Sequence, residues 1–249
     1  MKPLILFFIV LGILSCNQPK KPTDADAAKF IFRATVERIR AATLPEISDV
    51  SNCIVVKVKE VIYAPPDFGD WTGKSITVSV KEIGRQKPDL EQVFYTNGWL
   101  YGKSLAVVER ASRDSRKITN KQVLDGITAY QDQKVRDRLK SSELVVSGKI
   151  IKVSEEDKQK TDSEHDPYWM TAVIEVDSFE KGKSEDHTVI FRFALSYDVM
   201  WEGSPKFKVG DIGIWLFRRN PDKEKYFTIT ESEDFFPIER LSYIRSLLK

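Results

Sequence analysis

The chain has 249 residues and a formal charge of +2, with 39 Lys and Arg residues against 37 Asp and Glu. A balance this close excludes a protein that holds nucleic acid through a global basic field. The aromatic content of 11% and the many Val and Ile residues predict a packed, β-rich fold rather than disorder. The length suffices for one large β domain or two of ordinary size.

Residues 1–15 have the pattern of a secretory signal peptide. Lys2 supplies a positive charge, and the apolar run from Leu4 to Leu14 covers eleven residues. A membrane-spanning helix needs about 20 apolar residues, so this run fits a cleaved signal better than a span.

The signal ends in Ile13-Leu14-Ser15-Cys16, which resembles the lipobox of bacterial lipoproteins. In that family a peptidase cleaves before the cysteine, which then carries a diacylglycerol and an amide-linked acyl chain. The resemblance implies that Cys16 is lipidated, for example with palmitate, and tethers the protein to a membrane of the cell envelope. Asn17 favours the outer membrane, because an Asp at that position tends to retain enteric lipoproteins at the inner one. An ordinary cleaved signal and an uncleaved anchor remain as alternatives.

If Cys16 is acylated, Cys53 has no cysteine to pair with. A catalytic thiol needs a base nearby, usually histidine, and both His165 and His187 lie in the other half of the chain. We therefore expect Cys53 to be a small residue within a strand.

Residues 16–28 are polar and predict a tether, and residues 29–118 predict a first OB-like β-barrel domain. Alternating apolar and polar residues indicate its strands. Asn97-Gly98 is a strong turn signal between the last two. The expected strand segments are 30–39, 52–63, 73–80, 93–95 and 102–108.

Residues 119–140 change to a helical period and predict an amphipathic connecting helix. Thr119 and Gln122 fit a capping box at its start. Residues 141–249 then predict a second OB-like domain, in which Pro237 starts a short C-terminal helix. Its expected strand segments are 144–153, 169–180, 187–195, 210–216 and 226–230.

The strand order of the second half repeats that of the first, and residues 210–216 match residues 102–108 in pattern. The fold class we expect is mainly β, with two tandem small OB-like β-barrels joined by an amphipathic helix. Chance similarity between two β-rich halves is the alternative. A five-strand unit hides its strand edges by closing into a barrel.

The second half also resembles netrin-like domains of the kind found in tissue inhibitors of metalloproteases. The resemblance lies in residues 143–150, in residues 172–176 before Lys181-Gly182, and in residues 208–211 before residues 215–217. It implies a fold and not an activity. In that family an N-terminal cysteine with a free amino group ligates the target's zinc, whereas Cys16 would be acylated.

Two groups of residues could carry chemistry. The acidic stretch 155–166 could hold a divalent cation but lacks the EF-hand spacing, so a solvated loop is favoured and no metal ligand is assigned. Exposed aromatic residues could form a stacking platform for a ligand, foremost Trp99, Tyr101 and Trp201, although core packing would explain them too. The aromatic residues considered are Trp71, Trp99, Tyr101, Tyr168, Trp169 and Trp201.

The sequence has no nucleophile elbow, zinc-protease motif, P-loop or dinucleotide fingerprint. We therefore expect no enzyme, no catalytic residues and no cofactor, but a lipid-anchored envelope protein acting as a non-catalytic binding or scaffolding module. Its expected partners are the membrane, through the lipid, and another envelope protein, with no nucleic acid. The alternatives are an envelope hydrolase with a cation in the 155–166 loop and a protease inhibitor.

Overall fold

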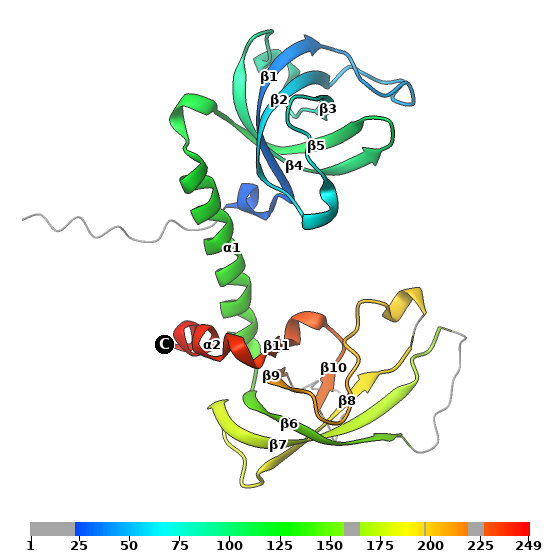
Figure 1. Cartoon of the computed structure of the whole chain (residues 1–249), viewed down its shortest axis with the longest axis vertical. Helices are drawn as coiled ribbons and strands as arrows, with labels where there is room; N and C mark the ends of the chain where they lie inside the picture. Colours follow the sequence, from blue (N-terminus) through cyan, green and yellow to red (C-terminus); the bar gives the residue numbers. More distant parts are fainter. Residues whose placement is uncertain (1–22, 157–164, 197, 219–226) are drawn as a thin grey trace, which may run out of the picture. The chain divides into compact units, whose positions relative to one another are not determined.

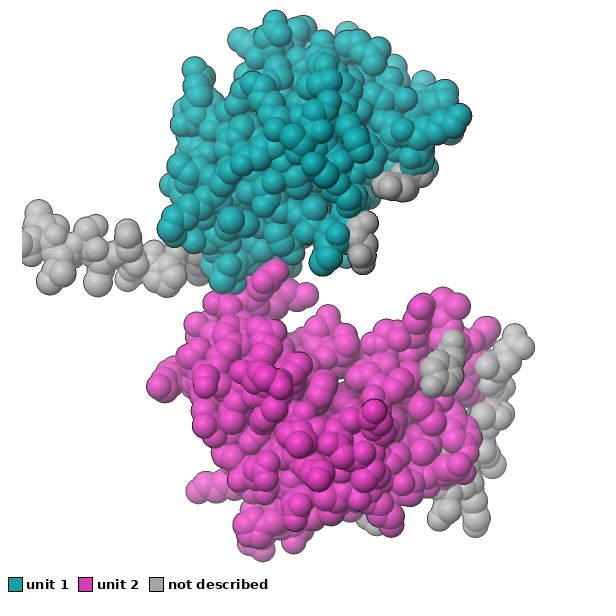
Figure 2. Space-filling model, viewed as in Figure 1, with its two compact units in different colours: residues 1–130 teal, residues 131–249 magenta. Residues whose placement is uncertain are grey.

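The computed structural model describes residues 23–156, 165–196, 198–218 and 227–249. The signal peptide, Cys16 and half of the tether lie outside these residues. The chain divides into two compact units, residues 1–130 (unit 1) and residues 131–249 (unit 2), which Figure 2 colours separately. Each unit buries a hydrophobic core of its own, and the chain is mainly β, as expected.

Unit 1 contains a closed five-stranded barrel, which confirms the architecture expected for this part of the chain (Figure 1). Its strands are β1 (Phe30–Ile39), β2 (Cys53–Tyr63), β3 (Ser75–Ser79), β4 (Glu91–Tyr101) and β5 (Leu105–Asp114). They hydrogen-bond in the cyclic order β1-β2-β3-β5-β4, with β3 and β5 parallel. Closure leaves no strand of the ring with an unpaired edge, which is how a small OB-like barrel protects itself.

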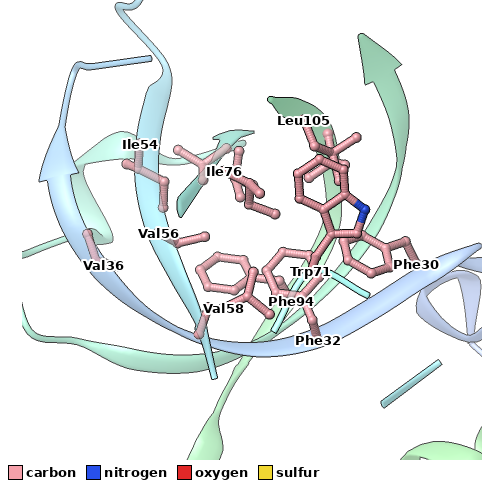
Figure 3. Packing of buried hydrophobic residues seen from close by; sticks show 14 residues of the cluster. Phe30, Phe32, Val36, Ile54, Val56, Val58, Trp71, Ile76, Phe94 and Leu105 are labelled. Atoms are coloured by element: carbon pink, nitrogen blue, oxygen red, sulfur yellow. The ribbon is translucent and has the colours of Figure 1, made fainter. Parts of the chain in front are cut away.

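The barrel is filled by side chains from alternate strand positions, which all point inward because successive residues of a strand face opposite sides (Figure 3). Phe32 stacks on Phe94 with their ring centroids 5.6 Å apart. Trp71 lies buried in the same cluster, and its indole N–H donates to the Phe68 carbonyl at 3.1 Å. Trp71 is therefore a core residue and not part of an exposed aromatic surface.

Asn97-Gly98 does not form the expected turn but lies inside β4. Asn97 pairs with Val108 and Gly98 with Val107 of β5, and the register shifts between Gly98 and Leu100. The chain reverses after Tyr101, where the Gly102 N–H donates to the Ser104 carbonyl at 3.0 Å. The turn prediction was wrong because the ladder with β5 outweighs the local preference of Asn-Gly.

Unit 2 is an open, curled sheet of six strands in the order β10-β8-β7-β6-β9-β11. Its strands are β6 (Leu144–Glu155), β7 (Trp169–Lys181), β8 (Thr188–Ala194), β9 (Ile212–Phe217), β10 (Phe227–Ile229) and β11 (Phe235–Pro237). Aromatic rings dominate its core, where Phe207 meets Phe191 and Phe193 edge-on at centroid distances of 5.4 and 5.3 Å. The second barrel that we expected is thus a half-barrel.

The strand pairing of unit 2 nevertheless repeats that of unit 1, except for the pair that closes the barrel. β6 pairs antiparallel with β7 and β9, as β1 does with β2 and β4, and β10 runs parallel to β8, as β5 does to β3. β9 is therefore the counterpart of β4, and matching residues 210–216 with residues 102–108 of β5 was wrong. The sheet stays open because the edge of β9 that would close the barrel pairs with β11.

The connecting helix α1 (Asn120–Ser141) begins at the predicted capping box. The Thr119 N–H donates to Gln122 Oε1 at 2.9 Å, and the Gln122 N–H donates back to Thr119 Oγ1 at 3.3 Å. These bonds satisfy two backbone donors that have no partner within the helix.

The two halves of α1 belong to different cores. In unit 1, Ile127 lies in one buried cluster with Ile31 of β1 and Tyr95 of β4. In unit 2, Leu139 lies in a cluster with Leu216 of β9. Because β9 is the counterpart of β4, each half of the helix covers the equivalent outer face of its own unit.

The remaining helices are short. α2 (Leu241–Leu248) is the expected C-terminal helix, and its Arg245 guanidinium holds the Glu180 carboxylate at 2.7 and 2.9 Å. This contact lowers the pKa of Glu180. The single-turn helices are η1 (Asp24–Ala27), η2 (Pro66–Phe68), η3 (Ile83–Arg85), η4 (Ser115–Lys117), η5 (Val199–Trp201), η6 (Ser232–Asp234) and η7 (Ile238–Arg240).

Gly148 of β6 supports a specific stability prediction. A Cβ atom there would lie 2.2 Å from the Glu175 carbonyl oxygen, which is backbone and cannot rotate away. We predict that Gly148→Ala lowers the free energy of unfolding of unit 2 by about 3 kcal/mol in urea denaturation. Gly203→Ala in the same unit, where nothing lies within 4 Å of the new methyl group, is the control and should change stability by less than about 0.5 kcal/mol. Equal losses at both positions would contradict the steric argument.

Lys181, the last residue of β7, supports a second prediction at the end of α1. Its ammonium group donates to the carbonyls of Leu139, Lys140 and Ser142 at 2.7, 2.9 and 2.6 Å. A cation there satisfies terminal carbonyls and opposes the negative end of the helix dipole. Lys181→Met should therefore cost about 1–3 kcal/mol and speed amide exchange in the last turn of α1. The exposed neighbour Lys183, changed to Met, should leave both unaltered.

Candidate binding surface in the second unit

Of the three aromatic residues predicted to line a binding surface, only Trp201 has a described side chain. Trp99 and Tyr101 are residues of β4 in unit 1, and their side chains lie outside the described part of the structure. Trp201 ends η5, in the segment between β8 and β9 of unit 2, and is half-buried. Trp99 and Tyr101 thus belong to unit 1 and Trp201 to unit 2.

Trp201 lies among aromatic side chains where β7 begins and β8 ends. Its indole N–H donates to the His165 carbonyl at 2.9 Å, and its ring meets Trp169 edge-on at a centroid distance of 5.8 Å. The Arg192 guanidinium lies 4.4 Å from the centroid of the Trp169 ring, a cation–π contact. Tyr168 precedes Trp169 and is exposed. We call this region the aromatic end, defined as Tyr168, Trp169, Val199, Met200 and Trp201.

The loop that carries η5 is held in one shape by polar contacts. The Asp198 carboxylate accepts from the Met200 N–H at 2.9 Å, and its other oxygen lies 3.0 Å from His165 Nδ1. Both bonds lower the pKa of Asp198, and the bond with His165 has the larger effect. At the end of η5, the Lys206 ammonium group donates to the Trp201 carbonyl at 3.0 Å. Burial lowers the pKa of Lys206.

Val199 and Met200 project from this fixed loop into solvent. Their exposed fractions are 85% and 75%, the highest of any large hydrophobic residue in the described chain. Sequence reasoning singled out only Trp201 in this loop. The available signal was the run Val199-Met200-Trp201 itself, because three consecutive apolar residues between Asp198 and Glu202 follow neither a strand nor a helix period.

The acidic stretch 155–166 is described only at its ends, and residues 157–164 lie outside the described structure. The Glu156 carboxylate accepts from the Arg192 guanidinium at 2.7 Å, and a hydrogen bond to Glu155 raises the pKa of Tyr168. Across the described residues, no group of three or more His, Cys, Asp or Glu side chains is placed to hold a metal ion. A cation in this loop stays a prediction.

Unit 1 has a hollow of about 540 Å³ between the start of β4 and η4. Within it, the Ser115 hydroxyl donates to Glu91 Oε1 at 2.6 Å, and Glu91 also accepts from Lys59. The lining mixes both signs of charge, which gives no preference for an anionic or a cationic ligand. It consists of Lys87, Pro88, Asp89, Leu90, Glu91, Ser115 and Arg116.

Cys53 begins β2 and is buried, as expected for a structural residue. Burial raises the pKa of its thiol, the opposite of what activates a nucleophilic cysteine.

Neither a scan against protein-family models nor a search of curated proteins finds a match to this chain. None of the described helices has the length and apolar composition needed to cross a membrane.

The contacts of Asp198 predict how the η5 loop responds to acid. Hydrogen bonds hold its folded pKa below the value of about 3.9 for an unstructured aspartate. The contacts are therefore complete above that value and are lost as the pH falls through the folded pKa. We expect the indole N–H resonance of Trp201 to shift in that acid range, and Asp198→Asn to show the shifted resonance already at neutral pH.

The matched control is Glu202→Gln, which removes a neighbouring exposed carboxylate from the same loop. It should keep the wild-type profile. If the Trp201 resonance shifts neither in acid nor in the Asp198→Asn variant, Asp198 does not fix the loop.

Proposed function

We propose that this chain is a lipoprotein of the bacterial cell envelope, anchored by acyl chains on Cys16, whose two β units form a non-catalytic binding or scaffolding module. The observation that carries the proposal is the coincidence at residues 1–16 of a positive charge, a short apolar run, a small residue and a cysteine. Asn17 favours the outer membrane.

The aromatic end of unit 2 supports the binding part of this proposal. A binding surface benefits from side chains that are fixed before the partner arrives, because less conformational freedom is then lost on association. The η5 loop meets this condition, since Asp198, His165 and Lys206 fix its backbone while Val199 and Met200 stay in water. Amphipathic rings such as Trp201 and Tyr168 are also enriched at binding surfaces.

The anchor is tested by metabolic labelling with palmitate in a bacterial host. We expect the wild-type chain to take up label and to partition with membranes, and Cys16→Ala to do neither. The matched control is Cys53→Ala, which removes the other cysteine of the sequence and should label like wild type. Equal labelling of wild type and Cys16→Ala would refute the anchor, as would an unmodified thiol found by mass spectrometry on a mature Cys16.

A further inference from the structure

We infer that η5 is a second, non-covalent membrane contact, through which Val199 and Met200 enter the interfacial layer of a lipid bilayer. The inference rests on the proposed envelope function, which brings a bilayer within reach, and it names the partner of the aromatic end. The partner is the lipid surface itself.

The first argument is the shape and rigidity of the loop. A single helical turn carries two adjacent apolar side chains outward, and Asp198 caps that turn through the Met200 N–H. The Ser204 N–H and the Lys206 ammonium group both donate to the Trp201 carbonyl, each at 3.0 Å. The exposed side chains of Val199 and Met200 are therefore carried by a hydrogen-bonded turn.

The second argument is the order of residue types behind the tip. Trp201 follows the aliphatic tip in the chain and packs on Trp169, which the exposed Tyr168 precedes, and Trp and Tyr are the residues that concentrate where a bilayer meets water. Their rings pack in the headgroup layer while their polar atoms stay hydrated. The indole N–H of Trp201 is already satisfied by the His165 carbonyl, so moving it toward the bilayer leaves no donor without a partner.

The third argument is area, which separates a bilayer from a protein partner. A stable protein interface buries about 800 Å² on each partner. Two side chains at the end of one turn cover only a fraction of that area, so they make a poor docking face for a second copy or another globular protein. Insertion into a bilayer needs no matching surface, and a small apolar area is enough when another anchor shares the load.

The fourth argument is the length of chain before the described fold. Cys16 lies seven residues before Thr23, where the described structure begins, and seven extended residues span at most about 25 Å. An acyl anchor on Cys16 would thus hold the start of unit 1 close to one bilayer, and because unit 2 is tethered to unit 1 by the chain, a weak second contact is strengthened by the effective concentration.

Charge predicts which vesicles should bind. Both signs of charge surround the tip: Glu202 is exposed and Asp198 is matched by His165, while the Lys206 ammonium group binds the Trp201 carbonyl and the Arg192 guanidinium is paired with Glu156. This is not a polybasic patch, so attraction to anionic lipid is not what drives the contact. Zwitterionic vesicles should therefore bind as well as vesicles that contain anionic lipid.

The test uses the chain from residue 16 onward with Cys16→Ser, so that no acyl chain contributes. Sedimentation with phosphatidylcholine–phosphatidylethanolamine vesicles should show binding, and Val199→Ser combined with Met200→Ser should weaken it at least about tenfold. Val209→Ser and Ile212→Ser are matched controls, because they remove exposed aliphatic side chains elsewhere in unit 2 and should leave binding unchanged. Thermal unfolding of each variant verifies that the fold is kept.

A second measurement reports where the tip lies. Lipids brominated along the acyl chain should quench tryptophan fluorescence in the wild-type chain, and Trp201→Phe should remove most of that quenching. The inference is overturned by equal binding of the double variant, by no binding of wild type, or by binding that needs anionic lipid and vanishes in salt. It is also overturned if the tip residues instead govern self-association without lipid.

These results are independent of palmitate labelling. Loss of the anchor with vesicle binding retained would refute only the lipoprotein assignment. Labelling of Cys16 without vesicle binding would refute only the membrane contact of η5.

Discussion

The requirement that the central strand edges be paired shapes both units of this chain, although β10 and β11 remain as the edges of the open sheet in unit 2. In unit 1 it is met by closing the ring through β4 and β5, which leaves no strand of the barrel at an edge. In unit 2 the corresponding edge of β9 is taken by the short strand β11, and β10 stays on the far side of the sheet beside β8. One pairing pattern thus gives a barrel in one case and a half-barrel in the other. Where β4 of unit 1 pairs with β5, β9 of unit 2 pairs with the three residues of β11, Phe235–Pro237.

Gly213 helps to explain why β11 can take that place. A Cβ atom on Gly213 would lie 2.2 Å from the ring of Phe235, so only a residue without a side chain lets the ring lie flat against β9. The ring also meets Trp215 and Phe207, each at a centroid distance of 5.3 Å. These contacts extend the aromatic core of unit 2 as far as β11.

Most strands were predictable from alternating apolar and polar residues, and β1 was located to the residue at 30–39, whereas the three residues of β11 are too few to show such a pattern and were not predicted. Pairing was not predictable, because Gly102–Val108 and Gly210–Leu216 share a local pattern while their partners lie far away in sequence, and this misled the comparison of β5 with β9. The candidate surface was only partly predictable, because it too depends on contacts between residues that are far apart in the sequence. Trp201 is fixed by His165, 36 positions earlier, and no periodicity reports such a contact.

β1 is hydrogen-bonded along both edges, to β2 on one side and β4 on the other, and it follows directly on the first described residues. A pull on the amino-terminal end of the chain would act along the axis of β1. It would shear two ladders at once instead of peeling one open bond by bond. Such a pull would also have to displace η1, whose Asp26 carboxylate lies so close to α1 that a Cβ atom on Gly126 would be 2.7 Å from it. Tension at this end of the protein is therefore resisted by a strand that is paired along both of its edges.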